Sequence, residues 1–458
     1  MPTSAVGHRV EHAHLAFTLA VQRALAGGGL RPENGSRAES SVETACWSPY
    51  SVACALGLAA TGARGTTRAE LVALLLGNTE PLGDNERSDA QSIATHNTTD
   101  AGKALGTALG TALGEQSAML AEHSAMLGEA SALDSGAIAP GGDQPVLGVA
   151  NTLWTREDTP IHAEFTAELG RWPSGRVRTA PFQGQPEAAR RLINADVAET
   201  TRGLIPELLG AGSVTASTVA TLVNALYLKV AWRNPFPARG TERRLFHAPS
   251  GPLQVPTMRL SNKRLGYAAA NGWQVVVLPA AGDVEAVILL PDNTGNAASG
   301  RAAAGGDAAR GELGTDSRLG GSGTAESTLD ADVLASLLAA PAPIPVDLYL
   351  PKFTVRARAD LTSALAALGA RTMFTGQADF SGISDQRMPL SGVRHEAVLT
   401  VDEQGLEGAA ATGVVMRALA LRRDVTEPLV VRVDRPFLFL VRHRASGAVY
   451  FLARITHP

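Results

Sequence analysis

Residues Val401 to Met416 read VDEQGLEGAAATGVVM, an acidic start followed by small residues and a β-branched end. Alternate side chains of a strand point to opposite faces of a sheet. In a sheet, one face of this segment would carry only apolar or small side chains: Leu406, Gly408, Ala410, Thr412, Val414 and Met416. The charges of Glu407 and Arg417 fall on the other face, so the first face can be buried without desolvating a charge.

The same segment is poorly suited to forming a strand from the outset. Gly405, Gly408 and Gly413 raise the entropic cost of an extended conformation, and the alanine run offers little apolar area for packing. These residues alone fit two structures equally well, a surface loop rich in glycine and alanine or a loop that later becomes a strand. The flanking sequence decides between them.

Eight segments between Trp47 and Pro458 resemble, in the same order, segments of the serpin family of protease inhibitors. They are WSPYSVACALGLAATGARGTT (47–67), GVANTLW (148–154), EAARRLINADVAETTRGLIPELL (187–209), VNALYLKVAWRNPF (223–236), LPKF (350–353), LGARTMFTGQADFSGIS (368–384), VRHEAVLTVDEQG (393–405) and DRPFLFLVRHRASGAVYFLARITHP (434–458). Each match alone is weak, but their shared order is specific. The resemblance implies an α+β serpin fold with three β-sheets, about eight to nine helices and an exposed reactive-centre loop.

The resemblance also implies which residues act when the central sheet opens. Ser48, Ser51, Asn224, Trp232 and His395 match structural positions under the sheet or where the loop begins. The hinge of the loop matches Glu403, Gln404, Gly405, Leu406, Glu407, Gly408, Ala409, Ala410, Ala411 and Thr412. These roles are structural, so we expect no catalytic residue, cofactor or metal ligand.

A suicide inhibitor is the mechanism that the resemblance implies. A target serine protease attacks the loop and forms an acyl-enzyme, and the freed loop then inserts as a new central strand. About a dozen new backbone hydrogen bonds at roughly 1 kcal/mol each would release on the order of 10 kcal/mol. That is comparable with the whole stability of an ordinary domain.

The family's spacing predicts the reactive bond. Counting Glu403 as the first hinge residue, the seventeenth is Leu419, which places cleavage between Leu419 and Ala420. A leucine suits an apolar specificity pocket and predicts chymotrypsin-like, elastase-like or subtilisin-like proteases as partners. The basic pair Arg422 and Arg423 is the alternative reactive bond, and it would suit trypsin-like enzymes.

Two hinge positions depart from the pattern of inhibitory serpins. Leu406 stands where the family usually has Thr or Ser, and Gly408 where it usually has Ala. Both are uncharged and neither is proline, so neither forbids insertion, although the bulk of Leu406 could slow it. The alternative function is therefore a non-inhibitory serpin-fold protein, either a protease substrate or a binding or chaperone-like module.

Composition narrows the functional classes. With 45% hydrophobic residues, 18% charged residues and a formal net charge of −4, the chain can bury a large core and gives no reason to expect nucleic-acid or membrane binding. There is no G-x-S-x-G elbow or P-loop lysine, so an enzyme is not expected. The start of the chain lacks a secretory pattern, which predicts a cytoplasmic location with non-classical secretion left open. Four lysines against thirty-six arginines suggest a GC-rich bacterial coding sequence.

The ordered matches predict one serpin domain over residues 1–458, with insertions at 81–145 and 293–328. The first insertion has a seven-residue repeat beginning at Ser117, Ser124 and Ser131, which predicts a docked or frayed helix. Between Glu80 and Asp143 the fixed positive charges are Arg87 and Lys103, against ten acidic residues. Heparin-type activation is therefore not expected. The second insertion is predicted to be a disordered loop, and the protein is expected to be a monomer.

Overall fold

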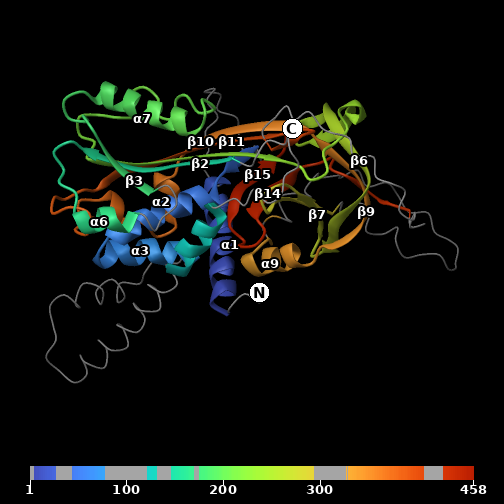
Figure 1. Cartoon of the computed structure of the whole chain (residues 1–458), viewed down its shortest axis with the longest axis horizontal. Coiled ribbons are helices and arrows are strands. Elements are labelled where there is room, and N and C mark those ends of the chain that lie inside the picture. The colour runs from blue at the N-terminus through green and yellow to red at the C-terminus, as the bar shows by residue number, and fades with distance from the viewer. Residues whose placement is uncertain are drawn as a thin grey trace, which may run out of the picture.

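The computed structural model describes residues 5–26, 44–77, 121–131, 146–169, 175–292, 326, 328–406 and 427–458. Helices surround two sheets in an α+β arrangement (Figure 1). The helices are α1 (Ala5–Ala26), α2 (Pro49–Gly62), α3 (Gly65–Leu75), α6 (Ala163–Glu168), α7 (Pro186–Thr200), α9 (Ala331–Ala339), α10 (Thr362–Ala367) and a helix over residues 121–131, with 3-10 turns η2 (Ala238–Gly240) and η3 (Thr372–Phe374).

The six-stranded sheet carries the loop hinge. Its strand order is β10 (Phe353–Asp360), β11 (Leu390–Val401), β12 (Gly405–Leu406), β4 (Ala220–Ala231), β2 (Val146–Arg156) and β3 (Gly175–Ala180). β11 also pairs directly with β4, in parallel, from Leu390 opposite Ala220 to Ala397 opposite Leu226. We call this β11–β4 boundary the seam. It is closed along that stretch, and β12 occupies the seam beyond it.

The remaining strands form a nine-stranded sheet. Its order is β1 (Ala45–Trp47), β15 (Val449–Ile455), β14 (Phe437–His443), β8 (Val284–Pro291), β7 (Trp273–Pro279), β6 (Gly251–Ala270), β9 (Ala342–Pro351) and β13 (Leu429–Arg432), with β5 (Glu242–Ala248) on β6. β6 is 20 residues long and pairs with β5, β9 and β7 in succession. Because β6 is continuous, two of the sheets that the resemblance implies are joined in one hydrogen-bonded network.

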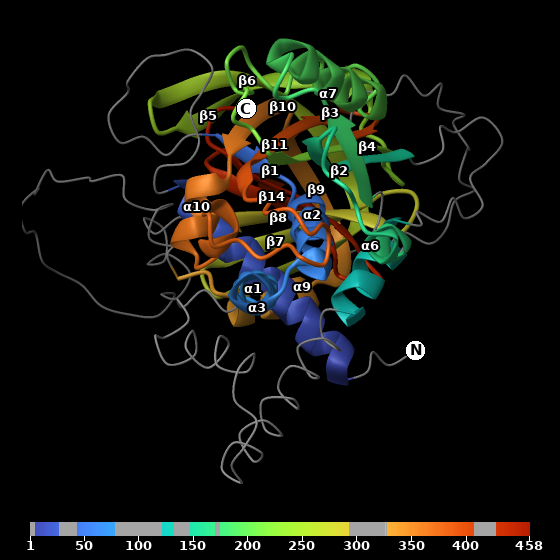
Figure 2. The same cartoon turned by 90° about the vertical axis from the view of Figure 1, so that its left-hand side faces the viewer.

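Helix α2 lies under the six-stranded sheet (Figure 2). It starts with Pro49 at its first position, and the side chain of its N-cap, Ser48, accepts a hydrogen bond from the Ser51 amide at 3.1 Å. Both are standard N-terminal signals. The rest of α2 is apolar and small, and nearly all of it is buried, as expected of a helix surrounded by protein. It shares the main core with inward-facing strand residues such as Leu153 and Leu222.

Helix α7 and the connection that follows it cover the opposite face of this sheet (Figure 1). Ile193 and Val197 of α7 pack with Trp154 of β2 and Val223 of β4, and Val398 of β11 lies against the same cluster. The two clusters take alternate residues along the strands, since neighbouring side chains face opposite ways. The sheet is therefore buried on both faces around the seam.

The helix over residues 121–131 lies within the first predicted insertion. Its buried residues lie on one side, at the spacing of a docked helix, and are His123, Ser124, Met126, Leu127 and Ala130. The Tyr450 hydroxyl donates a hydrogen bond to the Ala130 carbonyl. The other residues of 81–145, and 293–328 apart from Glu326 and Thr328, lie outside the described residues. Among the residues that the structure does describe, no helix is long and apolar enough to span a bilayer.

Candidate functional site: the seam and the loop hinge

A buried polar cluster holds the seam on its α2 side. His395 of β11 is directly opposite Asn224 of β4, and the His395 Nδ1 to Asn224 Oδ1 distance is 2.5 Å. The Asn224 amide nitrogen is 2.6 Å from both the Ser51 carbonyl and the Ser51 hydroxyl, and it also donates to Asn151 Oδ1. Ser48, Ser51, Asn224 and His395 are each 0% exposed. The structure therefore brings four of the predicted residues into one network.

The hydrogen bonds define the protonation state of His395. The Ser48 backbone amide donates to His395 Nε2 at 3.0 Å, so Nε2 must be unprotonated and the proton is on Nδ1, where it is donated to Asn224 Oδ1. A second proton on Nε2 would face the Ser48 N–H. Burial lowers the pKa of His395 from its ordinary value to about 3, because the charged ring would lose its hydration.

Acidification is therefore expected to destabilise the protein through His395. The unfolded histidine takes up a proton below about pH 6.5, whereas the folded one does not until about pH 3. Stability contributed by the neutral ring is present above pH 6.5 and is lost as the pH falls. At pH 5 the loss is about 2 kcal/mol. Burial also lowers the pKa of His14 and His123, so these histidines add to the loss in the wild type and in the variant alike. Chemical unfolding at pH 7 and pH 5 should therefore show a loss that is about 2 kcal/mol smaller in His395→Gln than in the wild type.

Exposed His247 supplies the control. His247→Gln should keep the pH dependence of the wild type. The same pH dependence in His395→Gln and in the wild type would contradict the assignment of the effect to His395.

The first hinge residues lie where the seam ends. Trp232 follows β4, and its Nε1 donates to the Asp402 carbonyl at 2.9 Å, while its backbone amide donates to the Gln404 carbonyl at 2.9 Å. The Phe236 amide donates to the Glu403 carbonyl at 2.8 Å. Predicted residues Trp232, Glu403 and Gln404 therefore meet at one place, and they anchor the start of the loop to the β4 side.

Glu403 is held by an ion pair. Its Oε2 is 2.7 Å from Lys352 Nζ, and Thr241 donates a hydrogen bond to its Oε1 at 2.7 Å. Burial raises the pKa of Glu403, but the hydrogen bonds from Lys352 and Thr241 outweigh it, so the pKa lies below its ordinary value. The carboxylate stays ionised at neutral pH and attaches the hinge to the residue that separates β9 from β10.

Gly405 and Leu406 form a short strand inside the seam. Gly405 pairs with Ala231, and Leu406 pairs with Val230 on one side and Val401 on the other. A Cβ on Gly405 would stand 2.1 Å from the Val230 carbonyl oxygen, so only glycine permits this approach. Leu406 is 1% exposed and belongs to the main core. The departure noted at Leu406 thus places an apolar side chain in an apolar position.

The other predicted site residues lie outside the described residues. These are the hinge from Glu407 to Thr412 and both candidate reactive bonds, Leu419–Ala420 and Arg422–Arg423. Sequence reasoning missed Asn151 and Lys352, which contact Asn224 and Glu403. Both residues lie in segments that resemble the serpin family, GVANTLW and LPKF. The sequence therefore pointed to these two segments, but it did not indicate that Asn151 contacts Asn224 or that Lys352 contacts Glu403. Within the described part of the chain, no three His, Cys, Asp or Glu residues gather in a way that could hold a metal.

The central sheet thus has a seam held by buried polar residues, and the short strand β12 lies between its two central strands, β11 and β4. A family model described as "Serpin (serine protease inhibitor)" matches residues 34–303 and 318–458. The chain therefore belongs to the serpin family, and the predicted family and α+β fold are confirmed.

Individual relatives agree with this assignment. Leukocyte elastase inhibitor of Bos taurus is 33% identical over 316 residues, which cover 68% of this chain and 78% of the relative. The structure of uncleaved ovalbumin is similar with a TM-score of 0.69 at 22% identity, covering 98% of this chain and 100% of that one. Human thyroxine-binding globulin in complex with its hormone is similar with a TM-score of 0.69 at 20% identity, covering 99% and 100%. These relatives give no support to a bacterial source, which stays a prediction from composition.

Proposed function

We propose that this protein is a suicide inhibitor of serine proteases that prefer an apolar residue at the cleavage site. In this proposal the protease cleaves between Leu419 and Ala420, and the loop then inserts along the seam. One observation carries the proposal: β12 already lies between β4 and β11 and is antiparallel to both. The elastase inhibitor among the relatives supports a target of elastase-like specificity.

The strand pairing favours insertion energetically. Extending β12 would replace one parallel pairing, between β11 and β4, by two antiparallel pairings. Antiparallel pairing is slightly more stable per residue, and one complete ladder of hydrogen bonds is gained. At roughly 1 kcal/mol for each bond, the gain is on the order of 10 kcal/mol. The uncleaved protein is then metastable relative to the inserted form.

Incubation with chymotrypsin, subtilisin and trypsin tests the proposal. We expect an SDS-stable complex with chymotrypsin or subtilisin, and mass spectrometry should find a released peptide that begins at Ala420. A peptide that begins at Arg423, from a complex with trypsin, would move the reactive bond to Arg422–Arg423. The absence of a complex with all three enzymes would contradict inhibition.

A non-inhibitory serpin is the second candidate. The observation that favours it is Leu406, whose side chain is larger than the Thr or Ser typical of inhibitory hinges, and thyroxine-binding globulin shows that this fold also serves a hormone-binding protein. A protein that is only a substrate would be cut without forming a complex. A binding module would in addition gain no thermal stability on cleavage, because its loop would not insert.

A further inference from the structure

Two arginines of β10 reach across the sheet to the connection between α7 and β4. Arg356 donates from Nη1 to Glu396 Oε1 at 2.8 Å and from Nη2 to the Leu204 carbonyl at 2.6 Å. Arg358 donates from Nε to Glu396 Oε2 at 3.0 Å and from Nη2 to the Glu207 carbonyl. Each guanidinium therefore holds a carboxylate with one nitrogen and a loop carbonyl with another.

Glu396 is the centre of this arrangement. It lies on β11 next to His395, is 0% exposed, and faces the α7 side of the sheet while His395 faces α2. A buried carboxylate requires compensating charge, and the two guanidiniums supply it. Because Glu396 is opposite Ala225 and His395 is opposite Asn224, polar contacts on both faces lie at the same level of the seam.

The loop carbonyls belong to the other side of the seam. Asn194 of α7 donates from Nδ2 to the Leu209 carbonyl at 2.9 Å and accepts from the Leu208 and Leu209 amides, and Arg190 donates to the Leu209 carbonyl at 2.7 Å. Leu208 and Leu209 also pack in the cluster that contains residues of β2 and β4. The connection is thus fastened to α7, β2 and β4.

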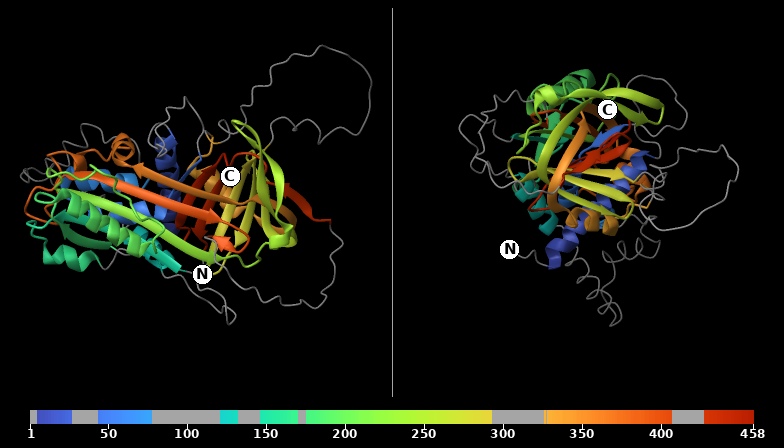
Figure 3. Two further views of the ribbon diagram at one scale, coloured as in Figure 1. Left: turned by 90° about the horizontal axis from the view of Figure 1, so that it is seen from above. Right: turned by 90° about the vertical axis from the view of Figure 1, so that its right-hand side faces the viewer.

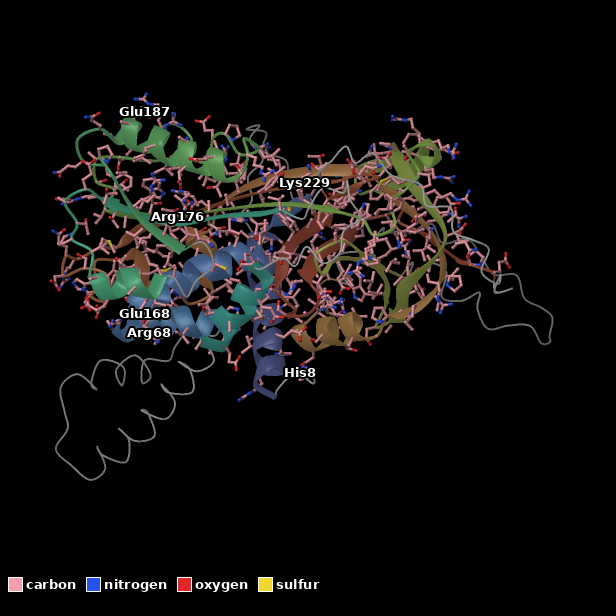
Figure 4. All side chains as sticks on the ribbon, in the orientation of Figure 1. His8, Arg68, Glu168, Arg176, Glu187 and Lys229 are labelled. Atoms are coloured by element: carbon pink, nitrogen blue, oxygen red, sulfur yellow. The ribbon has the colours of Figure 1, made fainter. Side chains whose placement is uncertain are left out.

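β10 and β11, in orange, run alongside α7, in green, when the molecule is seen from above (Figure 3). Glu187, which binds Arg190 through its carboxylate at 2.6 Å, marks the outward side of α7 (Figure 4). Because Arg356 and Arg358 lie on β10 and bond to carbonyls of the α7–β4 connection, they join two parts of the molecule that meet at the seam.

We infer that Arg356, Arg358 and Glu396 form a latch that must release the α7–β4 connection before the hinge can insert beyond Leu406. The inference rests on the proposed function. An inserted strand would separate β11 from β4 by a further 4.7–4.9 Å or so. The hydrogen bonds from Arg356 and Arg358 to the Leu204 and Glu207 carbonyls would not survive such a displacement. The latch resists the first opening of the sheet and so controls the rate of loop insertion.

Lysine variants test the latch without removing its charge. The double variant Arg356→Lys, Arg358→Lys can still neutralise Glu396, but an ammonium lacks the fork that holds two partners in fixed directions. We expect insertion after cleavage to become about tenfold faster, equivalent to about 1.4 kcal/mol. The matched control is Arg394→Lys, because Arg394 of β11 pairs with Asp360 of β10 and bridges only strands on one side of the seam.

Insertion can be followed with a fluorophore on Arg417→Cys, since both native cysteines, Cys46 and Cys54, are buried. With subtilisin in excess, cleavage of the loop is fast, so the fluorescence change follows the rate of insertion. A rise in the melting temperature of the cleaved protein then records that insertion has occurred. A double variant that inserts at the rate of the wild type and of Arg394→Lys would overturn the latch alone. A wild type that gains no thermal stability after cleavage would overturn both the latch and the proposed function.

Discussion

Leu406→Arg is expected to convert the protein from an inhibitor into a substrate. Leu406 is 1% exposed between Val230 and Val401, and an unpaired charge there would cost about 3–5 kcal/mol. The hinge would leave the seam, and insertion would be blocked at its first step while cleavage of the loop continued. Titration of protease with the variant should require at least about tenfold more protein for each enzyme molecule trapped, with cleaved product in place of complex on SDS gels.

Leu429→Arg is the matched control for this variant. Leu429 is the first residue of β13, which follows the loop in the sequence, and it is 38% exposed. The same substitution at Leu429 therefore buries no charge. It should form complexes as the wild type does. Normal inhibition by Leu406→Arg would show that the loop does not insert through this position.

Asn224→Ala is expected to lower the stability of the uncleaved protein by about 2–4 kcal/mol. Asn224 bonds to His395, Ser51 and Asn151, and its removal leaves several buried polar atoms without a partner, at about 1–3 kcal/mol for each. Some of this cost is recovered when water enters the space. Urea unfolding followed by tryptophan fluorescence should shift to lower denaturant concentration.

Thr221→Val, on the same strand, separates loss of the network from general damage to β4. Thr221 is buried and makes one long hydrogen bond, 3.4 Å from its hydroxyl to the Gly392 carbonyl. Its replacement should cost about 1 kcal/mol or less. Equal destabilisation by the two variants would mean that Asn224 acts as an ordinary strand residue.

Local sequence signals predicted much of the fold around the site. The Ser-Pro start of α2 was readable because capping depends on residues close together in the chain, and the structure contains that cap at Ser48. The alternation of apolar residues likewise placed Leu406 on the face that would be buried. The resemblance identified Asn224 and His395, whose contact joins positions 171 residues apart.

Other parts of the site depend on distances between residues that are far apart in the chain, and no local sequence pattern predicts such distances. The seam accepts Gly405 and Leu406 because β4 and β11 diverge beyond Leu226 and Ala397, which is a property of two strands far apart in the chain. Arg356 binds the Leu204 carbonyl across 152 residues. Because every residue has a backbone carbonyl, the sequence does not indicate which carbonyl accepts a hydrogen bond from Arg356.

The sequence by itself predicted that residues 401–416 can become a strand, because side-chain alternation and glycine content are local properties. Of this prediction the structure describes the short strand Gly405–Leu406. The sequence also determined the family, through motifs in a shared order. Only the tertiary structure decided how many hinge residues lie between β4 and β11, because that number depends on where these two strands stop pairing with each other. It alone decided what opposes further insertion, because burial and charge compensation at Glu396 arise only when β10, β11 and the α7–β4 connection pack together.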